Sequence, residues 1–296
     1  MPALPTLLLT VMVMVAFAGN SLLGRAALGR TGIDPASFTA IRVGSAALAT
    51  WGLVRLRPGR SAVSGDWGSA AALMVYAGAF SFAYVQLPVG AGALLLFPAV
   101  QATMVLGGLW RGERLGPAQV AGLLLALAGL VLLVRPGAAA AGSAPPPLTP
   151  ALLMIASGAA WGVYSLRGLG SADPAGATAG NFLRASVLAL GLGLACHARL
   201  HLDPAGCGYA VVSGALASGP IYALWYRTMR GLRAVTAAGV QLSVPVLSAL
   251  GGVVLLGEAF SLRMMAASVV ILGGIALVLA DRAGAKLPVK KVEMER

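Results

Sequence analysis

The feature that most constrains this sequence is a series of apolar runs, each about twenty residues long, that extends through nearly the whole chain. A helix needs about 20 apolar residues to cross the hydrocarbon core of a bilayer. Charged residues make up only 10% of the 296 residues, whereas a soluble domain carries about 25%. The sequence therefore predicts an all-α integral membrane protein, and soluble enzymes and DNA-binding domains are excluded.

Ten such runs are present, and several begin with a helix start signal. Asp34-Pro35, Asp173-Pro174 and Asp203-Pro204 each place a capping side chain before a proline at the first helical position. The first run is too long for a signal-peptide core and no basic region precedes it, so it is interpreted as a span. The predicted spans are 4–24, 35–54, 67–88, 91–110, 117–134, 150–168, 174–195, 206–226, 234–256 and 261–280.

Lysines and arginines lie mostly on one side of these spans. Ten spans place both termini on the same side, and the segments on that side hold 14 of the 21 basic residues. The opposite side holds 5, and Arg42 and Arg184 fall inside spans. Because basic residues concentrate in cytoplasmic segments of membrane proteins, we expect both termini to be cytoplasmic.

The chain divides into two halves at an uncharged segment, 136–149, whose alanines and prolines are typical of a linker. The first half is 1–135, the second is 150–281, and a basic tail, 282–296, follows. A shift of 145 residues aligns seven identical positions of the halves. These are Gly107, Gly112, Glu113, Ala121, Leu127, Gly129 and Leu132, with Gly252, Gly257, Glu258, Ala266, Leu272, Gly274 and Leu277.

Five spans in each half have a geometric consequence. After an odd number of spans the chain emerges on the opposite side, so the second half runs upside down relative to the first. Inverted repeats are common in secondary transporters, which bind substrate near the middle of the membrane where the repeats meet. The sequence therefore predicts two inverted five-helix repeats around a central cavity.

Several short motifs occur in order along the chain. They are Asn20, Pro35 and Arg42, then Pro98 with Gly112-Glu113, then Trp161, Tyr164, Pro174 and Arg184, and finally Pro245 with Gly257-Glu258. Together with the ten spans, this set resembles the EamA family of the drug/metabolite transporter superfamily. The aromatic content of the third, fourth, sixth and eighth spans is similar to that of YddG-type aromatic amino acid exporters.

The resemblance implies a bacterial inner-membrane protein that exports amino acids, aromatic and other, or similar small metabolites by alternating access. Its partners would be a small-molecule substrate and the lipid bilayer, not nucleic acid, and it would be a monomer or a weak homodimer. Two other functions stay open: export of amphipathic drugs and lipid handling.

Prolines inside spans predict helix breaks, because a proline frees the carbonyl four residues earlier. Pro98 and Pro245 occupy equivalent spans, and Pro220 lies in the eighth span. Breaks at matching places of two repeats are typical of a transport site. Gln101 and Gln241 lie one helical turn from such prolines, so we expect their amides to face the cavity.

Aromatic side chains in the middle of a span offer flat apolar faces to an amphipathic solute. The predicted substrate-binding residues are Asn20, Phe80, Tyr84, Phe97, Gln101, Trp161, Tyr164, Tyr222 and Gln241. Ordinary helix packing is the alternative for each of them. Aromatic residues at span ends, among them Trp110 and Tyr226, are interpreted as interfacial anchors.

Charged residues bear on the mechanism. Arg42 and Arg184 are assigned to gating, with a substrate carboxylate as the alternative partner, because Arg42 lies near enough to a span end to extend towards water. All nine acidic residues lie at span ends or in loops. Without a buried carboxylate to carry a proton, we predict facilitated diffusion. Glu113 and Glu258 are expected to cap the helices that follow them.

Catalytic and metal-binding signals are weak. The spans hold no convergent His, Asp and Ser set, and there is no phosphate-binding loop, so no enzyme activity and no cofactor are expected. The spacing of Cys196, His197, His201 and Cys207 matches no standard metal site. A disulfide between the two cysteines stays open.

Overall fold

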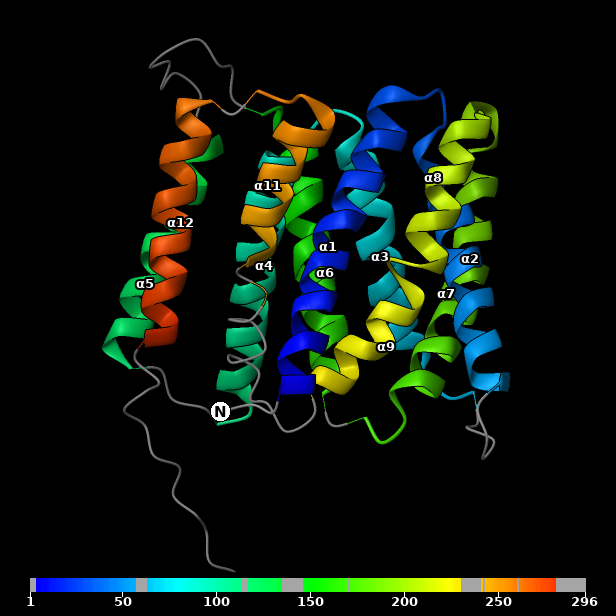
Figure 1. Ribbon diagram of the computed structural model, residues 1–296, viewed down its shortest axis with the longest axis horizontal. Coiled ribbons are helices and arrows are strands. Elements are labelled where there is room, and N and C mark those ends of the chain that lie inside the picture. The colour runs from blue at the N-terminus through cyan, green and yellow to red at the C-terminus, as the bar shows by residue number, and fades with distance from the viewer. Residues whose placement is uncertain are drawn as a thin grey trace, which may run out of the picture.

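The computed structural model describes residues 4–56, 63–112, 116–134, 146–169, 171–229, 241, 243–259 and 261–280. Figure 1 shows their helices standing side by side in one bundle. The helices of the first half are α1 (Leu4–Arg30), α2 (Pro35–Leu56), α3 (Trp67–Tyr84), α4 (Val89–Trp110) and α5 (Pro117–Val134). Those of the second half are α6 (Leu148–Gly168), α7 (Pro174–Ala195), η1 (His197–Arg199), α8 (Pro204–Ala215), α9 (Gly219–Thr228), α11 (Ser243–Leu256) and α12 (Leu262–Ala280).

Aspartate side chains fix several helix starts. Asp34 accepts hydrogen bonds from the backbone N–H groups of Ala36 and Ser37 at 2.9 Å, and Asp203 accepts one from Gly206 at 2.8 Å. These bonds satisfy donors that a helix leaves free in its first turn. Asp173 makes no such bond, although its position before Pro174 predicted one.

Two predicted spans differ from the structure. The run 206–226 is not one helix, because α8 ends at Ala215 and α9 begins at Gly219. Pro220 therefore lies in the first turn of α9 rather than inside a helix. Pro245 likewise lies in the first turn of α11, and the Gln241 carbonyl accepts a bond from the Val244 N–H at 3.1 Å. That carbonyl is not freed, which corrects the expectation for Pro245.

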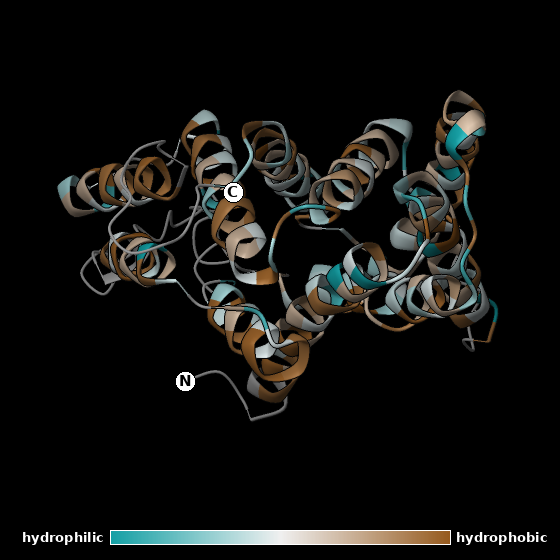
Figure 2. Cartoon of the chain, turned by 90° about the horizontal axis from the view of Figure 1, so that it is seen from above, coloured by the Kyte–Doolittle hydropathy of each residue, from teal (hydrophilic) through white to brown (hydrophobic). Residues whose placement is uncertain are grey.

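The bundle has the composition of a membrane protein. By length and apolar character alone, five helices of the described part can each cross a bilayer: 8–30, 89–110, 148–168, 174–195, and 204–228 with α8 and α9 taken together. Figure 2 shows that most of the ribbon is neutral to hydrophobic. Large apolar side chains such as Leu194 and Val254 are exposed on the outside of the bundle, where they suit lipid.

The two halves run in opposite directions. In Figure 1, α1 begins and α12 ends at the same end of the bundle, which we name the inner end; the other is the outer end. Arg30, at the end of α1, donates to the Leu256 carbonyl at the outer end, whereas Arg111, at the end of α4, donates to the Leu166 carbonyl of α6. The first helices of the two halves thus end on opposite sides.

Contacts between the halves follow a twofold pattern. Three pairs of equivalent helices pack on each other: α2 with α7, α4 with α11, and α5 with α12. Two further pairs of extensive contacts are related by the same symmetry, since α3–α6 corresponds to α1–α8 and α4–α6 corresponds to α1–α11. This pattern is what two inverted copies of one unit produce.

Gly112 and Gly257 show the equivalence locally. Both follow the fourth helix of their half, and both have a positive φ, +83° and +60°. Only glycine adopts this conformation without strain. The recurrence of glycine at these turns is therefore a backbone requirement in both halves.

Candidate substrate-binding site

Aromatic rings from both halves meet at the centre of the bundle. We name Phe17, Tyr76, Phe80, Trp161 and Tyr222 the aromatic cluster. The Trp161 ring lies in its middle, with centroid distances of 4.5 Å to Tyr222, 5.0 Å to Tyr76 and 5.4 Å to Phe17. These are the tilted and edge-to-face arrangements that aromatic pairs prefer. The five rings come from α1, α3, α6 and α9.

Two glycines of α6 determine how Trp161 is packed. A side chain on Gly158 would collide with the Leu96 carbonyl of α4, and one on Gly162 would lie 2.7 Å from the Thr103 Cβ. The absence of side chains at these positions lets α4 approach α6 closely, as is common between membrane helices. Trp161, between the two glycines, is consequently buried at the centre rather than exposed to lipid.

A buried polar network lies beside the rings. The Tyr76 hydroxyl accepts bonds from Asn20 Nδ2 at 3.2 Å, from Arg42 at 3.0 Å and from the Tyr222 hydroxyl at 3.0 Å. Arg42 also donates to the hydroxyl groups of Tyr222 at 3.0 Å and Ser218 at 3.2 Å. The network therefore joins α1, α2, α3 and α9 through polar groups that are almost completely shielded from solvent.

The two intramembrane arginines occupy different surroundings. Arg42 is 1% exposed and points into the network, which corrects the expectation that it extends towards water. Arg184 is half-buried and donates to the carbonyls of Ser64 and Gly180 at 2.9 Å. Ser64 lies just before α3, so Arg184 joins helix α7 to the segment that precedes α3 at the inner end and does not face the centre.

The central cavity is much smaller than expected. Its volume is about 20 Å³, and its lining includes Phe17, Asn20, Tyr76, Phe97 and Trp161. A space of this size holds about one water molecule, whereas small-molecule sites measure roughly 300–1,000 Å³. In the described residues, the rings predicted to line a solute-sized cavity fill it instead. The centre is therefore closed in this conformation.

The structure brings eight of the nine predicted substrate-binding residues together. Asn20, Phe80, Phe97 and Trp161 line the small cavity. The other four contact those residues directly: Tyr84 packs on Phe80, Tyr164 and Tyr222 pack on Trp161, and Gln241 accepts the Trp161 indole N–H at 3.0 Å.

Gln101 lies apart from this group. With Pro98 it lines a separate pocket of about 220 Å³ between α4, α5 and α6. The sequence placed it one turn from Pro98 correctly but could not give the direction of its face. Three residues of the centre were missed as binding residues. Phe17 lies one turn before Asn20 on the same face of α1, Tyr76 lies one turn before Phe80 on α3, and Ser218 directly precedes the start of α9.

Tyr226 is also placed differently from the prediction. It is 1% exposed, and its hydroxyl donates to the Tyr164 carbonyl at 2.9 Å. It is therefore a packing residue between α6 and α9, not an interfacial anchor. Trp110, by contrast, is 96% exposed at the end of α4, as an anchor requires.

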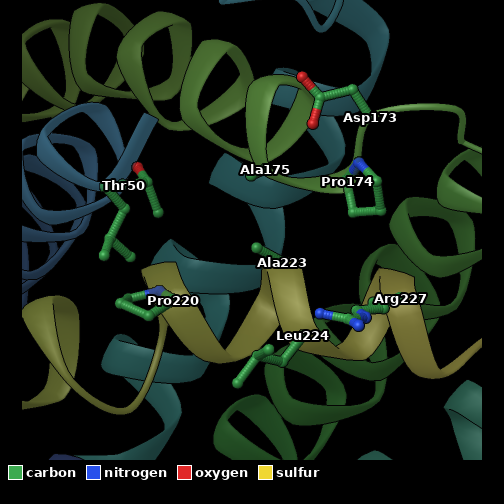
Figure 3. Close-up of a pocket in the computed structure, with 9 residues that line it drawn as sticks. Thr50, Asp173, Pro174, Ala175, Pro220, Ala223, Leu224 and Arg227 are labelled. Carbon is green, nitrogen blue, oxygen red and sulfur yellow. The ribbon is translucent and has the colours of Figure 1, made fainter. Parts of the chain in front are cut away.

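A larger pocket of about 410 Å³ opens at the inner end, and we name it the inner vestibule (Figure 3). Its lining includes Thr50 of α2, Asp173 and Pro174 at the start of α7, and Pro220 and Arg227 of α9. Pro220 is two residues from Ser218, which contacts Arg42. The residues at the break between α8 and α9 thus adjoin both the vestibule and the central network.

An ion pair joins the two halves at the outer end. Glu258 accepts a bond from Arg25 Nε at 3.1 Å and another from the Val89 N–H, at the start of α4, at 2.7 Å. Glu258 therefore caps α4 of the other half, not the helix that follows it. Glu113 lies outside the described residues. At the same end, Cys196 and Cys207 are both free thiols.

A second ion pair joins the two halves at the inner end. Arg167, in the last turn of α6, donates to Asp66 at 2.6 Å and to the Ser69 hydroxyl at 3.0 Å. Burial alone would raise the pKa of Asp66, but hydrogen bonds from Ser69 and the Arg167 guanidinium outweigh it and lower that pKa to about 2. Asp66 is therefore ionised throughout the physiological range.

The fold and the site together define a class of protein. This is an all-helical, multi-pass membrane protein whose two inverted repeats meet at a polar and aromatic centre, the architecture of a secondary transporter. The chain belongs to the EamA-like transporter family, whose model matches residues 4–135 and again residues 148–280. This family has a ten-helix membrane fold with two repeats and transports small molecules.

Two individual proteins are similar over nearly the whole chain. An uncharacterized protein of Pseudomonas aeruginosa is 58% identical over 286 residues, which cover 96% of this chain and 98% of that protein. A solved crystal structure of another protein matches with a TM-score of 0.67 at 23% identity, covering 95% of this chain and 98% of that chain. The second similarity concerns the fold alone.

Proposed function

We propose that this protein exports amino acids, aromatic and other, or similar small metabolites across the bacterial inner membrane by alternating access. Both termini are then cytoplasmic, so the inner vestibule faces the cytoplasm. The proposal is based on the aromatic cluster and its polar network, which lie where the two repeats meet. Such a centre offers flat apolar faces and hydrogen-bonding groups to an amphipathic solute.

The closed centre corresponds to an occluded step of this cycle. Each end is held by an ion pair that joins one repeat to the other, Arg25–Glu258 outside and Arg167–Asp66 inside. Separating one pair while keeping the other gives access from one side at a time. Substrate enters as the rings around Trp161 move apart, because the closed cavity of about 20 Å³ is too small to hold it.

The distribution of acidic residues supports facilitated diffusion. In the described part of the chain, the acids are Asp34, Asp66, Asp173, Asp203 and Glu258, and each lies at a helix end. None contacts the central network, so no carboxylate there can take up a proton when the centre changes its access. Flux would then follow the gradient of the substrate.

The test is transport by purified protein in liposomes, with labelled amino acids compared with a lipophilic cation. Trp161→Ala should slow amino acid uptake about tenfold or more, because truncating a central aromatic anchor removes much of a binding site. Gln101→Ala is the matched control, since its pocket is separate, and uptake should stay within about twofold.

Three results would contradict the proposal. The first is uptake of the cation but of no amino acid, which indicates a drug exporter. The second is lipid movement without solute uptake. The third is normal uptake by the Trp161→Ala variant.

A further inference from the structure

Arg42 is a buried cation whose charge no acidic group of the described residues neutralises. It is 1% exposed, and its hydrogen-bond acceptors are the hydroxyl groups of Ser218, Tyr76 and Tyr222. Its Nη1 group is buried and has no hydrogen-bond partner in the part of the chain that the structure describes. The acidic residues of the described segments all lie at helix ends, away from this network. A buried charge without a counter-charge is strongly unfavourable.

The network does not need the guanidinium to satisfy its other members. The Tyr222 hydroxyl donates to the Tyr76 hydroxyl at 3.0 Å, and the Ser218 hydroxyl donates to Asn20 Oδ1 at 3.4 Å. These bonds would persist if the arginine were replaced by a neutral residue. A purely structural role therefore does not account for a positive charge at this position.

The free edge of the guanidinium has the geometry of an anion site. A carboxylate accepts two parallel N–H bonds from arginine, and Nη1 supplies one donor that is already free. Nη2 supplies the second by exchanging a tyrosine hydroxyl for a carboxylate oxygen. The hydroxyl groups of Tyr76 and Tyr222 can rotate to donate to the same anion. Four donors would then surround one carboxylate.

The surroundings of this edge specify the rest of the ligand. The guanidinium carbon lies 4.7 Å from the centre of the Phe80 ring and 5.3 Å from that of Tyr76, and Phe17 and Trp161 complete the aromatic cluster. A flat apolar group fits between such rings. An ammonium group would find no carboxylate here, so a net charge of −1 neutralises the site better than a zwitterion does.

The inner vestibule offers a route to this site. Thr50 lines the vestibule and lies eight residues after Arg42 on α2, so Arg42 is about 12 Å deeper and about 80° round the helix. Pro220, just after the break between α8 and α9, lines the vestibule, and Ser218 in that break contacts Arg42. A small movement of this loop would join the vestibule to the guanidinium.

We propose that Arg42 binds the carboxylate of the substrate, and that this protein prefers monoanionic carboxylates with a flat apolar group to the corresponding amino acids. The inference rests on the proposed transport function and narrows its substrate class.

Three probes that share a phenyl group test the preference: 3-phenylpropionate, phenylalanine and phenethylamine. Their binding to detergent-purified protein is measured by the quenching of tryptophan fluorescence. Phenylpropionate should bind tightest, phenylalanine about tenfold more weakly, and phenethylamine without saturation. Arg42→Gln should weaken phenylpropionate binding about 10- to 100-fold, the usual effect of losing hydrogen bonds to a charged group. Arg55→Gln, an exposed arginine of the same helix, should change it less than twofold.

A second measurement separates ligand binding from a structural role. Without ligand, Arg42→Gln should unfold at the same temperature as the parent protein or higher, because it removes an uncompensated charge. Arg42→Lys, which keeps the charge but not the paired N–H groups, should bind phenylpropionate with intermediate affinity. A large drop in the unfolding temperature of Arg42→Gln, together with parental phenylpropionate binding by Arg42→Lys, would overturn the proposal.

Liposome uptake separates a failure of the proposed carboxylate site from a failure of the proposed transport function. If phenethylamine is transported as well as phenylpropionate, the carboxylate site is refuted while the transport function stands. If phenylpropionate binds through Arg42 but no probe crosses the membrane, the site stands and the transport function is refuted.

Discussion

The substitution Glu258→Gln tests whether the Arg25–Glu258 ion pair holds the outer end closed. The amide keeps an oxygen for the Val89 N–H but removes the charge that faces Arg25. The side chains of Arg25 and Glu258 are 22% and 14% exposed, so the pair is neither fully solvated nor fully buried. Exposed pairs contribute about 0–1 kcal/mol, and hydrogen bonds to charged groups about 1.5–3 kcal/mol. We therefore expect a loss of about 1–2 kcal/mol.

A loss of this size shifts the ratio of closed to open outer ends by about 5- to 30-fold. Ser21 lines the small central cavity and lies one turn before Arg25, so a cysteine there reports on outer access. In a background with Cys196 and Cys207 changed to serine, a membrane-impermeant thiol reagent should label Ser21→Cys about 5- to 30-fold faster when Glu258→Gln is present.

The control is Asp203→Asn at the same end, which alters a helix cap within one repeat and should leave labelling unchanged. The reasoning is refuted if Glu258→Gln labels at the parental rate while the protein stays folded. A double-mutant cycle with Arg25→Gln should give a coupling energy of about 1 kcal/mol or more, and a value near zero would equally refute it.

Two further predictions concern stability. Because the pKa of Asp66 is lowered to about 2 from 3.8, the stabilisation from its pair with Arg167 is complete above about pH 4 and is lost as the pH falls towards 2. The difference in unfolding temperature between the parent protein and Asp66→Asn should therefore be the same at pH 7 and pH 5, and its disappearance by pH 5 would be inconsistent with this pKa. Gly158→Ala should destabilise the protein by about 1–3 kcal/mol, because its methyl group meets the Leu96 carbonyl where α4 crosses α6. Gly44→Ala, with open space around it, should be neutral or stabilising in a thermal melt, and an equal loss in both variants would contradict the packing argument.

Much of the fold could be predicted because membrane helices are determined by local composition and by start signals. Helices α2, α3, α5 and α7 begin at the residues where the corresponding predicted spans begin. The error at 206–226 has a physical cause. Hydropathy is continuous through residues 216–218, and the break depends on Pro220 starting a new helix there.

The site was less predictable, because sequence gives a residue's depth in the membrane but not its direction in the bundle. Gln101 and Gln241 both lie one turn from a proline, yet Gln241 bonds Trp161 while Gln101 faces another pocket. Arg42 was expected to reach water because its position along α2 allowed that. Its actual direction depends on Tyr76 and Tyr222, which are distant in sequence. Such tertiary contacts leave no local pattern.

The packing of α5 on α12 bears on the origin of the chain. Gly129 and Gly274, which match in the internal repeat, each lie against the partner helix, with added Cβ atoms that would come within 2.7 Å of Ile271 and 2.5 Å of the Gly122 carbonyl. Equivalent surfaces that pack on themselves are what a symmetric dimer uses. Two separate copies of a five-helix chain, inserted in opposite orientations, could form the same three self-pairings. Gene duplication and fusion would then need to add little beyond the connecting segment.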